Sequence, residues 1–459
     1  MPVCRVASAV ICLSAAIASA EDPYEILWAR QFGTSERDFA NAVAVDGSGN
    51  LYVSGGTNGA VGPTSAGRED ALLAKYDSRG ALLWARQVGS TELDWSNAVA
   101  VDSTGNAYIV GTTWGNIEGT SAGYSDAFLA KYDSSGDQLW VRQFGTSRQD
   151  RARGVAVDHA GHVYVTGQFG AGIEDEDAFL AKYDSAGNRL WLKQLGVVGN
   201  HGSGAVAVDM ADNVYIGGST EGFSGPVSAP RDAYVAKLDG AGTLLWTSEL
   251  AGPDNESVTG LALDSAGNAY ITGHVRPGLD YDVHLSKCDA SGTFVWTRRI
   301  GADDRESYGG VAVDVAGNAY VTGWTRGSLF GPVAGSSDAF LAKYTPDGSF
   351  LWGLQLGSDD AERDTPRVAS GSDGKIYVCG ATSGSVGGPS IGDDDAFLVA
   401  LGAVCTADCD GDGALTLLDF LCFQNTFGAG DPAADCDGDG SLTFFDFLCF
   451  QNAFDAGCP

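Results

Sequence analysis

The sequence predicts a mainly β protein: a seven-bladed β-propeller followed by a small helical domain made of two copies of one segment. Two markers each recur seven times at intervals of 50–57 residues, a tryptophan in LLWARQ-like segments and an aspartate that opens DAFLAKY-like segments. Repeats of this length are typical of propellers and solenoids. A third observation, the recurrence of the acidic segment 408–427 at 435–454, sets the C-terminal end apart.

Each repeat unit reads as four short strands. In residues 97–145, AVAVD and AYIVG flank the turn DSTGN, and DAFLAKYD and QLWVRQFG flank the turn DSSG. β-branched and aromatic residues favour strands, and Asp-x-x-Gly supplies turn chemistry. Four strands repeated seven times indicate a propeller, because radial closure buries both faces of each blade and leaves only short edges.

The N-terminal strand is expected to close the ring. Residues 26–32 read as a fourth strand without the first three, whereas the last unit has three strands, at 368–369, 376–379 and 395–401, and lacks the fourth. We therefore expect residues 26–32 to complete the seventh blade.

Residues 1–20 have the features of a secretory signal peptide: a basic Arg5, an apolar run over residues 6–17 and the small residues 18–20 at the cleavage point. The apolar run is shorter than the roughly 20 residues that span a membrane, and no other segment is long enough. The sequence thus predicts a signal peptide at 1–20, a propeller at 21–402 and a C-terminal domain at 403–459. We expect a monomeric protein, secreted or on the cell surface, with no membrane span.

The chain carries a formal net charge of −32. Such a charge repels the phosphate backbone of nucleic acids and anionic membrane surfaces, so neither is expected as a partner. It suits a soluble extracellular protein that takes up divalent cations.

The acidic turns of the repeat are expected to be structural. Each offers one Asp and one Asn, too few oxygens for Ca²⁺, which takes about six to eight, and these residues cap their own turns. The unit GVAVDVAGNAYVTGWT, followed by DAFLAKYTPDGSFLWGLQLG, resembles the bacterial SBBP-type β-propeller repeat. The resemblance covers residues 26–401. It implies the β-propeller fold, and the family occurs in secreted and surface proteins. It implies no single function, because propellers host many activities.

The long connections between second and third strands differ most between units, and loops on a rigid scaffold often carry binding sites. Among their aromatic residues, the candidates for ligand contact are Trp114, Phe169 and Trp324. Two interpretations stay open: the rings stack on a sugar or peptide, or they fill the clefts between blades.

The loops that lead into each inner strand, here called lead-in loops, carry a polar residue six positions before the inner-strand alanine. These residues are Asp38, Asp94, Asp150, His201, Glu256, Glu306 and Arg363. They could ring an acidic channel mouth, or form a solvated loop face, which we favour. Two carboxylates could also cleave a glycoside. Nothing selects two of the seven, and no G-x-S-x-G motif appears, so we expect binding rather than catalysis.

Each copy of the C-terminal segment reads as a twelve-residue calcium loop that runs into a helix. Its oxygen-bearing residues have the spacing that Ca²⁺ requires, with a glycine at the sharp turn. Two tandem copies predict two Ca²⁺ sites. The expected ligands are Asp408, Asp410, Asp412, the carbonyl of Ala414, Thr416 through a water, and Asp419; then Asp435, Asp437, Asp439, the carbonyl of Ser441, Thr443 and Asp446.

These residues resemble the type I dockerin domain, whose duplicated EF-hand-like loop–helix segments use Asp at position 12. The match covers residues 405–459 and implies binding to a cohesin-like or cell-surface protein. The family's recognition positions fall on Leu417 and Leu418 and on Phe444 and Phe445. These apolar pairs could contact a partner or pack the two segments together. The basic residues usual later in each helix of the family are absent from this sequence.

Six cysteines lie in the last 55 residues, as expected in an oxidising compartment: Cys405, Cys409, Cys422, Cys436, Cys449 and Cys458. The outer two bracket the domain and could join its ends. The inner four keep the offset of the repeat and could pair within copies (409–422, 436–449) or across them (409–449, 422–436). Cys288 and Cys379, in propeller strands, are expected to be buried and unpaired.

Together these features predict a secreted, non-enzymatic protein of two domains. The propeller's loop face would bind a ligand, with carbohydrate as one candidate, and the Ca²⁺-loaded module would attach the protein to a partner or surface. The alternatives are an extracellular enzyme that acts on polysaccharide, with the propeller as catalytic domain, and a structural surface or adhesion protein.

Overall fold

The structure is a computed structural model. It describes residues 24–61, 66–170, 176–195, 201–220, 231–250, 252, 254–276, 281–301, 305–403, 407–409, 415–431, 434–436 and 441–456. The expected signal peptide at 1–20 lies outside these residues. The chain divides into two compact units, one spanning Ile26–Ala400 and the other containing the chain from Leu401 onward. No helix among the described residues is long and apolar enough to span a membrane.

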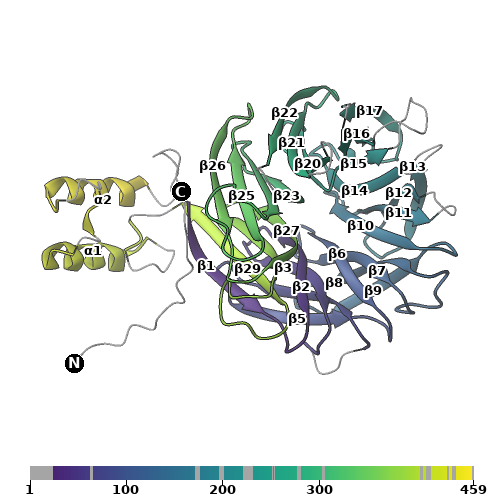
Figure 1. Ribbon diagram of the computed structural model, residues 1–459, viewed down its shortest axis with the longest axis horizontal. Coiled ribbons are helices and arrows are strands. Elements are labelled where there is room, and N and C mark those ends of the chain that lie inside the picture. The colour runs from purple at the N-terminus through teal and green to yellow at the C-terminus, as the bar shows by residue number, and fades with distance from the viewer. Residues whose placement is uncertain are drawn as a thin grey trace. The chain divides into compact units, whose positions relative to one another are not determined.

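The first unit is a β-propeller whose described residues form seven antiparallel sheets (Figure 1). Blades one to three are β2 (Asp38–Val45), β3 (Leu51–Thr57), β4 (Asp70–Tyr76) and β5 (Leu82–Val88); β6 (Asp94–Val101), β7 (Ala107–Thr113), β8 (Asp126–Tyr132) and β9 (Gln138–Phe144); β10 (Asp150–Val157), β11 (Val163–Gly170), β12 (Glu176–Tyr183) and β13 (Arg189–Leu195).

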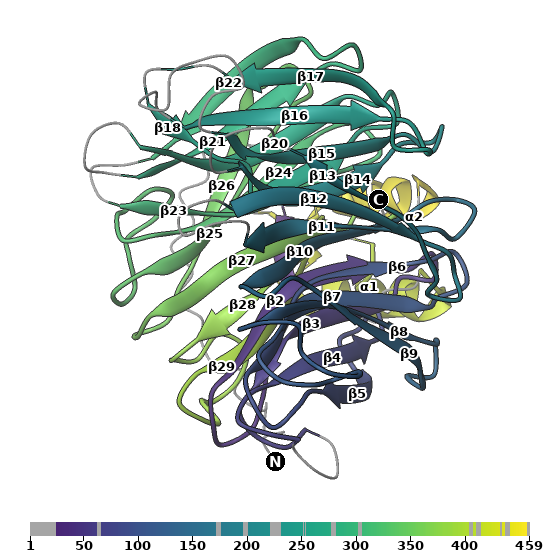
Figure 2. The same cartoon turned by 90° about the vertical axis from the view of Figure 1, so that its right-hand side faces the viewer.

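Blades four to seven follow the same order from the inner to the outer strand, as Figure 2 shows for blade three. They are β14 (His201–Val208), β15 (Val214–Thr220), β16 (Asp232–Leu238) and β17 (Leu244–Leu250); β18 (Asn255–Glu256), β19 (Gly260–Leu263), β20 (Ala269–Arg276), β21 (Asp282–Cys288) and β22 (Phe294–Ile300); β23 (Glu306–Val313), β24 (Ala319–Thr325), β25 (Asp338–Tyr344) and β26 (Phe350–Leu356); and β27 (Glu362–Ser370), β28 (Ile376–Thr382), β29 (Asp395–Ala403) and β1 (Tyr24–Phe32).

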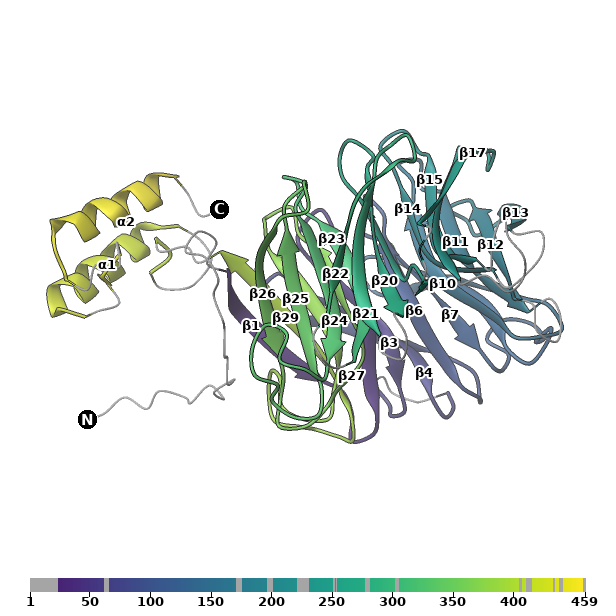
Figure 3. The ribbon, with the colours of Figure 1, turned by 45° about the horizontal axis from the view of Figure 1, so that its top comes forward.

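The N-terminal strand closes the ring, as the sequence predicts. The seventh sheet runs β27–β28–β29–β1, so β1 is its outer strand, and Figure 3 shows β1 beside β29. The side chains of β1 also reach blade one, where Trp28 Nε1 donates to the carbonyl of Ser78 at 3.1 Å and Arg30 Nε donates to that of Gly80 at 3.0 Å. The first and last segments of the propeller are thereby joined.

The hydrophobic core lies between successive blades. Tyr52 of blade one, for example, packs with residues of blade two around the buried Phe128 and Ile109. The repeated tryptophans pack at these junctions, and the indole N–H groups of five of them donate to a turn carbonyl of the next blade, as Trp84 Nε1 does to Ser134 O at 3.1 Å. Gly136 in that turn has φ +85°, and a Cβ there would lie 2.8 Å from the Trp84 ring. The turn glycine is therefore required both by its backbone and by its neighbour.

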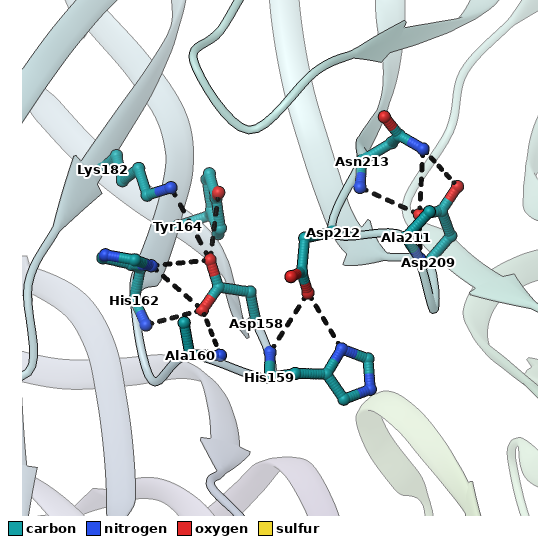
Figure 4. Close-up of polar contacts among 10 residues, drawn as sticks. All are labelled: Asp158, His159, Ala160, His162, Tyr164, Lys182, Asp209, Ala211, Asp212 and Asn213. Carbon is teal, nitrogen blue, oxygen red and sulfur yellow. Dashed lines mark hydrogen bonds and ion pairs between the residues drawn. The ribbon is translucent and has the colours of Figure 1, made fainter.

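The acidic turns are structural, as expected. Asp158 Oδ1 accepts from the backbone N–H groups of Ala160 and His162, and Oδ2 lies 3.6 Å from Lys182 Nζ (Figure 4). In the next blade Asp212 replaces the turn glycine and adopts φ +60°. Figure 4 shows its carboxylate held by the backbone and ring of His159, whose Nδ1 lies 2.9 Å away. Each carboxylate satisfies the backbone of a tight turn.

The second unit contains α1 (Leu417–Ala429) and α2 (Phe444–Ala456). Its core repeats at 27 residues, as the sequence does: Phe423 and Phe450 are buried and stack at 4.1 Å, with Ala407 and Ala434 beside them. Thr416 caps α1, accepting from Leu418 N at 3.0 Å while its own N–H donates to Asp419 at 2.7 Å. This reciprocal cap fixes the start of the helix.

Candidate functional site

The lead-in carboxylates do not form a solvated loop face, contrary to expectation. Asp38, Asp94, Asp150 and Glu306 are fully buried at the first residue of an inner strand. Each also donates its backbone N–H to the preceding blade, as when Asp94 N bonds to Glu69 O at 2.7 Å. Through these backbone hydrogen bonds the four residues join neighbouring blades. They neither face solvent nor ring a channel mouth.

The seventh member of this set is Glu362 rather than Arg363. Glu362 pairs with Thr382 in the register that pairs Asp38 with Thr57, and its side chain is buried. The inner strand of blade seven has its register shift between Arg363 and Arg367, around Pro366. This bulge contains one residue more than its counterpart in blade one, because proline cannot join the ladder. Counting back from the alanine therefore misplaces the position by one.

Five of the buried acids at the blade junctions interact with the aspartate that opens the third strand of the preceding blade. The pairs are Asp38–Asp395, Asp94–Asp70, Asp150–Asp126, Glu256–Asp232 and Glu362–Asp338. In the Asp38–Asp395 pair, one oxygen of each carboxyl accepts hydrogen bonds, from Thr34 and from Gln31 respectively. The other oxygen of each is buried and accepts no hydrogen bond from the described residues. Burial raises the pKa of Asp38, and the Asp395 charge adds to the shift. Burial likewise raises the pKa of Glu256 and of Glu362 to about 7.

The propeller is therefore expected to lose stability as pH rises from 5 to 8. A carboxyl whose pKa is raised in the folded state keeps its proton there at pH values at which the unfolded chain has already lost it. The stabilisation that this proton gives is complete below about pH 4.5 and is lost by about pH 7. The pKa of Asp102 and Asp209 is lowered, so their stabilisation is lost only at acidic pH, below 3.8. All ten tryptophans lie between residues 28 and 352, so thermal unfolding followed by tryptophan fluorescence reports the propeller alone.

The variant Glu362→Gln should flatten this pH dependence and melt above the wild type at pH 8, because an amide never acquires the buried charge. Glu36→Gln, at an exposed position of a lead-in loop, is the matched control. A wild-type melting temperature that is constant or rises between pH 5 and 8 would contradict the assignment.

The three aromatic ligand candidates have different surroundings. Phe169 is buried and stacks on Phe179 at 4.2 Å, so its ring fills the junction between blades two and three. Trp114 is 39% exposed, with its backbone N–H bonded to Leu93 O. Trp324 lies half-buried between two guanidinium groups, with Arg305 Cζ at 5.8 Å and Arg326 Cζ at 5.6 Å from its ring.

Trp324 belongs to a group of basic and aromatic residues on the loops and strand ends of blades four to six. Arg305 also lies 4.9 Å from the ring of Tyr281, and Arg276 lies 5.1 Å from it. Their positive charges, after the larger effect of burial, lower the pKa of the neighbouring His274 to about 4, which keeps its imidazole neutral. We call this group the arginine–aromatic cluster: Arg231, Arg276, Tyr281, Arg305, Trp324 and Arg326.

Sequence reasoning found Trp324 and missed the arginines. A signal was present in the repeat itself. The second-strand endings TGHVR (272–276) and TGWTR (322–326) carry a ring and an arginine where blade one has GGTN (55–58) and blade seven has GATS (380–383). Departures from a repeat in two adjacent units mark positions that the fold does not require.

In the C-terminal module, seven of the twelve expected calcium ligands are described: Asp408, Thr416, Asp419, Asp435, Ser441, Thr443 and Asp446. Asp410, Asp412, Ala414, Asp437 and Asp439 lie outside the described residues, and within those residues no three acidic, His or Cys side chains gather as a metal group. Asp419 and Asp446 are fully buried, and Asp446 accepts from Cys436 N at 2.9 Å and Thr443 N at 2.6 Å.

The composition of the module provides a test of its fit to calcium. Residues 405–459 contain ten Asp and no Lys, Arg or His. Buried carboxylates are normally paired with a cationic group or a metal ion. No side chain of the module can supply that positive charge, so the donor set fits a hard divalent cation.

The apolar pairs and the cysteines have clear positions. Leu417, Leu418, Phe444 and Phe445 are 60–70% exposed at the starts of the two helices, and they do not pack the segments together. Disulfides join Cys409 to Cys422 and Cys436 to Cys449, which is pairing within copies. Cys405 and Cys458 lie outside the described residues. Cys288 and Cys379 are buried and unpaired, as expected.

Two curated proteins are similar to part of the chain. Regulatory protein FlaEY of Caulobacter vibrioides is 26% identical over 178 residues, which are 34% of this chain and 19% of that protein. An uncharacterized WD repeat-containing protein of Acanthamoeba polyphaga mimivirus is 24% identical over 233 residues, 38% of this chain and 17% of that protein. The matched region thus spans less than a fifth of either relative.

A solved structure of an ulvan lyase of polysaccharide lyase family PL25, bound to -[GlcA(1-4)Rha3S]-, aligns with a TM-score of 0.50 and 12% identity over 80% of this chain and 95% of that chain. This likeness shows the fold alone. The family model for the beta-propeller repeat, SBBP, matches residues 27–63, 83–118, 139–168 and 295–331. The chain therefore carries SBBP beta-propeller repeats within a seven-bladed propeller.

Proposed function

We propose that this is a secreted binding protein: the C-terminal module holds two Ca²⁺ ions and attaches the protein to a partner, while the propeller's loop face binds a ligand. The observation that carries the proposal is the burial of Asp419 and Asp446 in a module with ten aspartates and no basic side chain. Two disulfides within that module support an extracellular location.

The first ion would be held by Asp408, Asp410, Asp412, the Ala414 carbonyl, Thr416 through a water, and Asp419, and the second by the equivalent residues 27 positions later. Calcium would neutralise the loop carboxylates and hold each loop against the following helix. Its binding free energy adds to the stability of the folded module.

The attachment surface would be the exposed pairs Leu417–Leu418 and Phe444–Phe445. The core of the module is built from other residues, chiefly Phe423 and Phe450, so the four exposed side chains are not needed to hold the helices together. Exposed apolar groups related by an internal repeat indicate a protein-binding surface. A cohesin-like or cell-surface protein is the expected partner.

A pull-down from fractionated cell envelope with the full mature chain tests this proposal. We expect retention in Ca²⁺ and its loss in chelator. The double variant Leu418→Ser/Phe445→Ser should lose retention in Ca²⁺ as well. Leu82→Ser/Leu83→Ser, which removes an equally exposed apolar pair on the propeller, should retain it. Retention that is equal in chelator, or unaffected by the module variant, would refute attachment through the module.

Cleavage of a polysaccharide is the second candidate function. It is favoured by the neutral imidazole of His274, whose ring lies 5.4 Å from that of Tyr281 beside the arginine–aromatic cluster, since such a pair can accept and donate protons. The ulvan lyase contributes a comparison of folds only. Release of new chain ends from an acidic polysaccharide, lost in His274→Asn, would favour this candidate over binding alone.

A further inference from the structure

The residues of the arginine–aromatic cluster come from four positions of the repeat in blades four to six, one of which is Trp324 within the second strand β24. Arg231 and Tyr281 precede the third strands β16 and β21, Arg276 and Arg326 end or follow the second strands β20 and β24, and Arg305 precedes the inner strand β23 (Figure 2). The backbone brings these positions together: Glu306 N, next to Arg305, donates to Tyr281 O at 2.9 Å, and Arg326 N donates to Arg305 O at 3.2 Å.

Many basic side chains elsewhere in the propeller have one of two repeated structural roles. Arg86, Arg142 and Arg298 donate to turn carbonyls of the next blade. In blades one to six, the lysine of the third strand lies over the tyrosine of the second strand, as Lys75 does over Tyr52 at 4.7 Å. The arginines of the cluster stand outside this pattern. The fold repeats without them in the other blades, so the fold itself does not require them.

The arginines of the cluster can bind a negatively charged group. Arg276 and Arg326 form no ion pair with any described residue, and Arg276 Nε is buried and makes no hydrogen bond within the described chain. Asp282, which opens the third strand of blade five, is already bonded by Arg299, which lies outside the cluster. Arg231, Arg305 and Arg326 are exposed, and Tyr281 and Trp324 are half-buried with ring surface open.

We propose that the arginine–aromatic cluster binds an acidic sugar unit of a polysaccharide, through a carboxylate or sulfate held by the arginines and a sugar ring packed on Trp324 or Tyr281. The inference rests on the proposed function, because it names the ligand class of the same loop face. Guanidinium groups bind planar and tetrahedral oxyanions through paired N–H donors. Aromatic rings supply the apolar contact that a sugar face requires.

Other ligand classes fit this surface less well. A neutral sugar would bring no counter-charge to Arg276 and Arg326, which form no ion pair with any described residue. Nucleic acid carries one charge per about 1.7 Å of duplex and would be opposed by the net charge of −32. An acidic peptide would satisfy the arginines but offers no ring face to the two aromatic residues.

Calorimetric titration of the full mature chain in Ca²⁺ tests this inference, with polygalacturonate, dextran sulfate, unmodified dextran and polyglutamate as probes. We expect binding to polygalacturonate or dextran sulfate, which distinguishes carboxylate from sulfate, and none to dextran or polyglutamate. Affinity should fall with added salt, because exposed charges are screened. Arg305→Gln/Arg326→Gln should weaken binding about 10- to 100-fold, the loss of one or more charge-assisted contacts.

Arg148→Gln is the matched control, an exposed arginine on the lead-in loop of blade three, and it should bind as the wild type does. Absence of binding to both acidic polysaccharides, equal binding of polyglutamate, or an equal loss in Arg148→Gln would overturn the inference. The envelope pull-down separates the two proposals. If calcium-dependent attachment persists without polysaccharide binding, this inference alone fails. If attachment is independent of calcium, the proposed function fails whatever the polymers do.

Discussion

Removal of calcium is expected to unfold the C-terminal module and to leave the propeller folded. Asp419 and Asp446 are buried in a unit without a basic side chain, so the loop carboxylates repel one another once the ions leave. A ligand at 100 times its dissociation constant stabilises the folded state by about 2.7 kcal/mol, and the module is small. Far-ultraviolet circular dichroism should lose helical signal in chelator, while tryptophan fluorescence, which arises only from the propeller, should not change.

Substitutions locate this effect on the calcium loops. Asp419→Asn and Asp446→Asn should each weaken calcium binding and lower the helical melting temperature in Ca²⁺. Asp431→Asn, between the two twelve-residue loops, should leave both unchanged. Helical melting that is the same in calcium and in chelator would show that the two disulfides and the stacked Phe423 and Phe450 suffice, and that the calcium assignment is wrong.

Deletion of residues 21–32 should open the ring and lower the melting temperature of the propeller by about 10 °C or more, among the largest effects that a local change can have. Strand β1 supplies the outer edge of blade seven. It also joins blade one through Trp28 and Arg30, and Gln31 Nε2 donates to Asp395 Oδ2 at 2.7 Å. Without it, β29 has an open edge and the junction between the two ends loses its outer cover.

Scanning fluorimetry of tryptophan emission measures this change, with a chain that starts at residue 24 as control. A synthetic peptide of residues 24–32 should restore part of the lost stability when it is added to the truncated chain. Gln31→Ala gives a milder variant that keeps the strand, and Gln87→Ala removes the equivalent contact with Asp70 inside blade one. Equal melting of the deletion and the control would mean that the ring is closed by other contacts.

The repeat pattern determined the fold. Seven tryptophans and seven strand-opening aspartates at a regular period predicted seven four-stranded blades, and the unmatched strand at residues 26–32 predicted how they close. The turn aspartates were also predicted correctly, because Asp-x-x-Gly chemistry is local and each carboxylate bonds to backbone within four residues of itself. Local rules and periodicity are properties that a sequence states directly.

Residues whose role depends on contacts between blades could not be assigned from the chain alone. Phe169 and Trp324 occupy the same long connections, yet one fills a junction and the other lies among arginines. The lead-in acids look like surface residues in a loop, but packing of the next blade buries them, and an extra residue in the bulge of β27 moves the acidic position from Arg363 to Glu362.

The sequence by itself thus determined the number of blades, the closing strand, the turn chemistry and the candidate calcium loops, because periodicity and ligand spacing are written along the chain. Only the tertiary structure decided that the cysteines pair within copies, that the four apolar residues of the module are exposed, and that arginines from three blades meet around Tyr281 and Trp324. The physical reason is that burial, disulfide partners and side-chain neighbours are contacts that form only when the chain folds. The paired cysteines are 13 residues apart in the sequence, and the cluster draws its residues from positions 231 to 326.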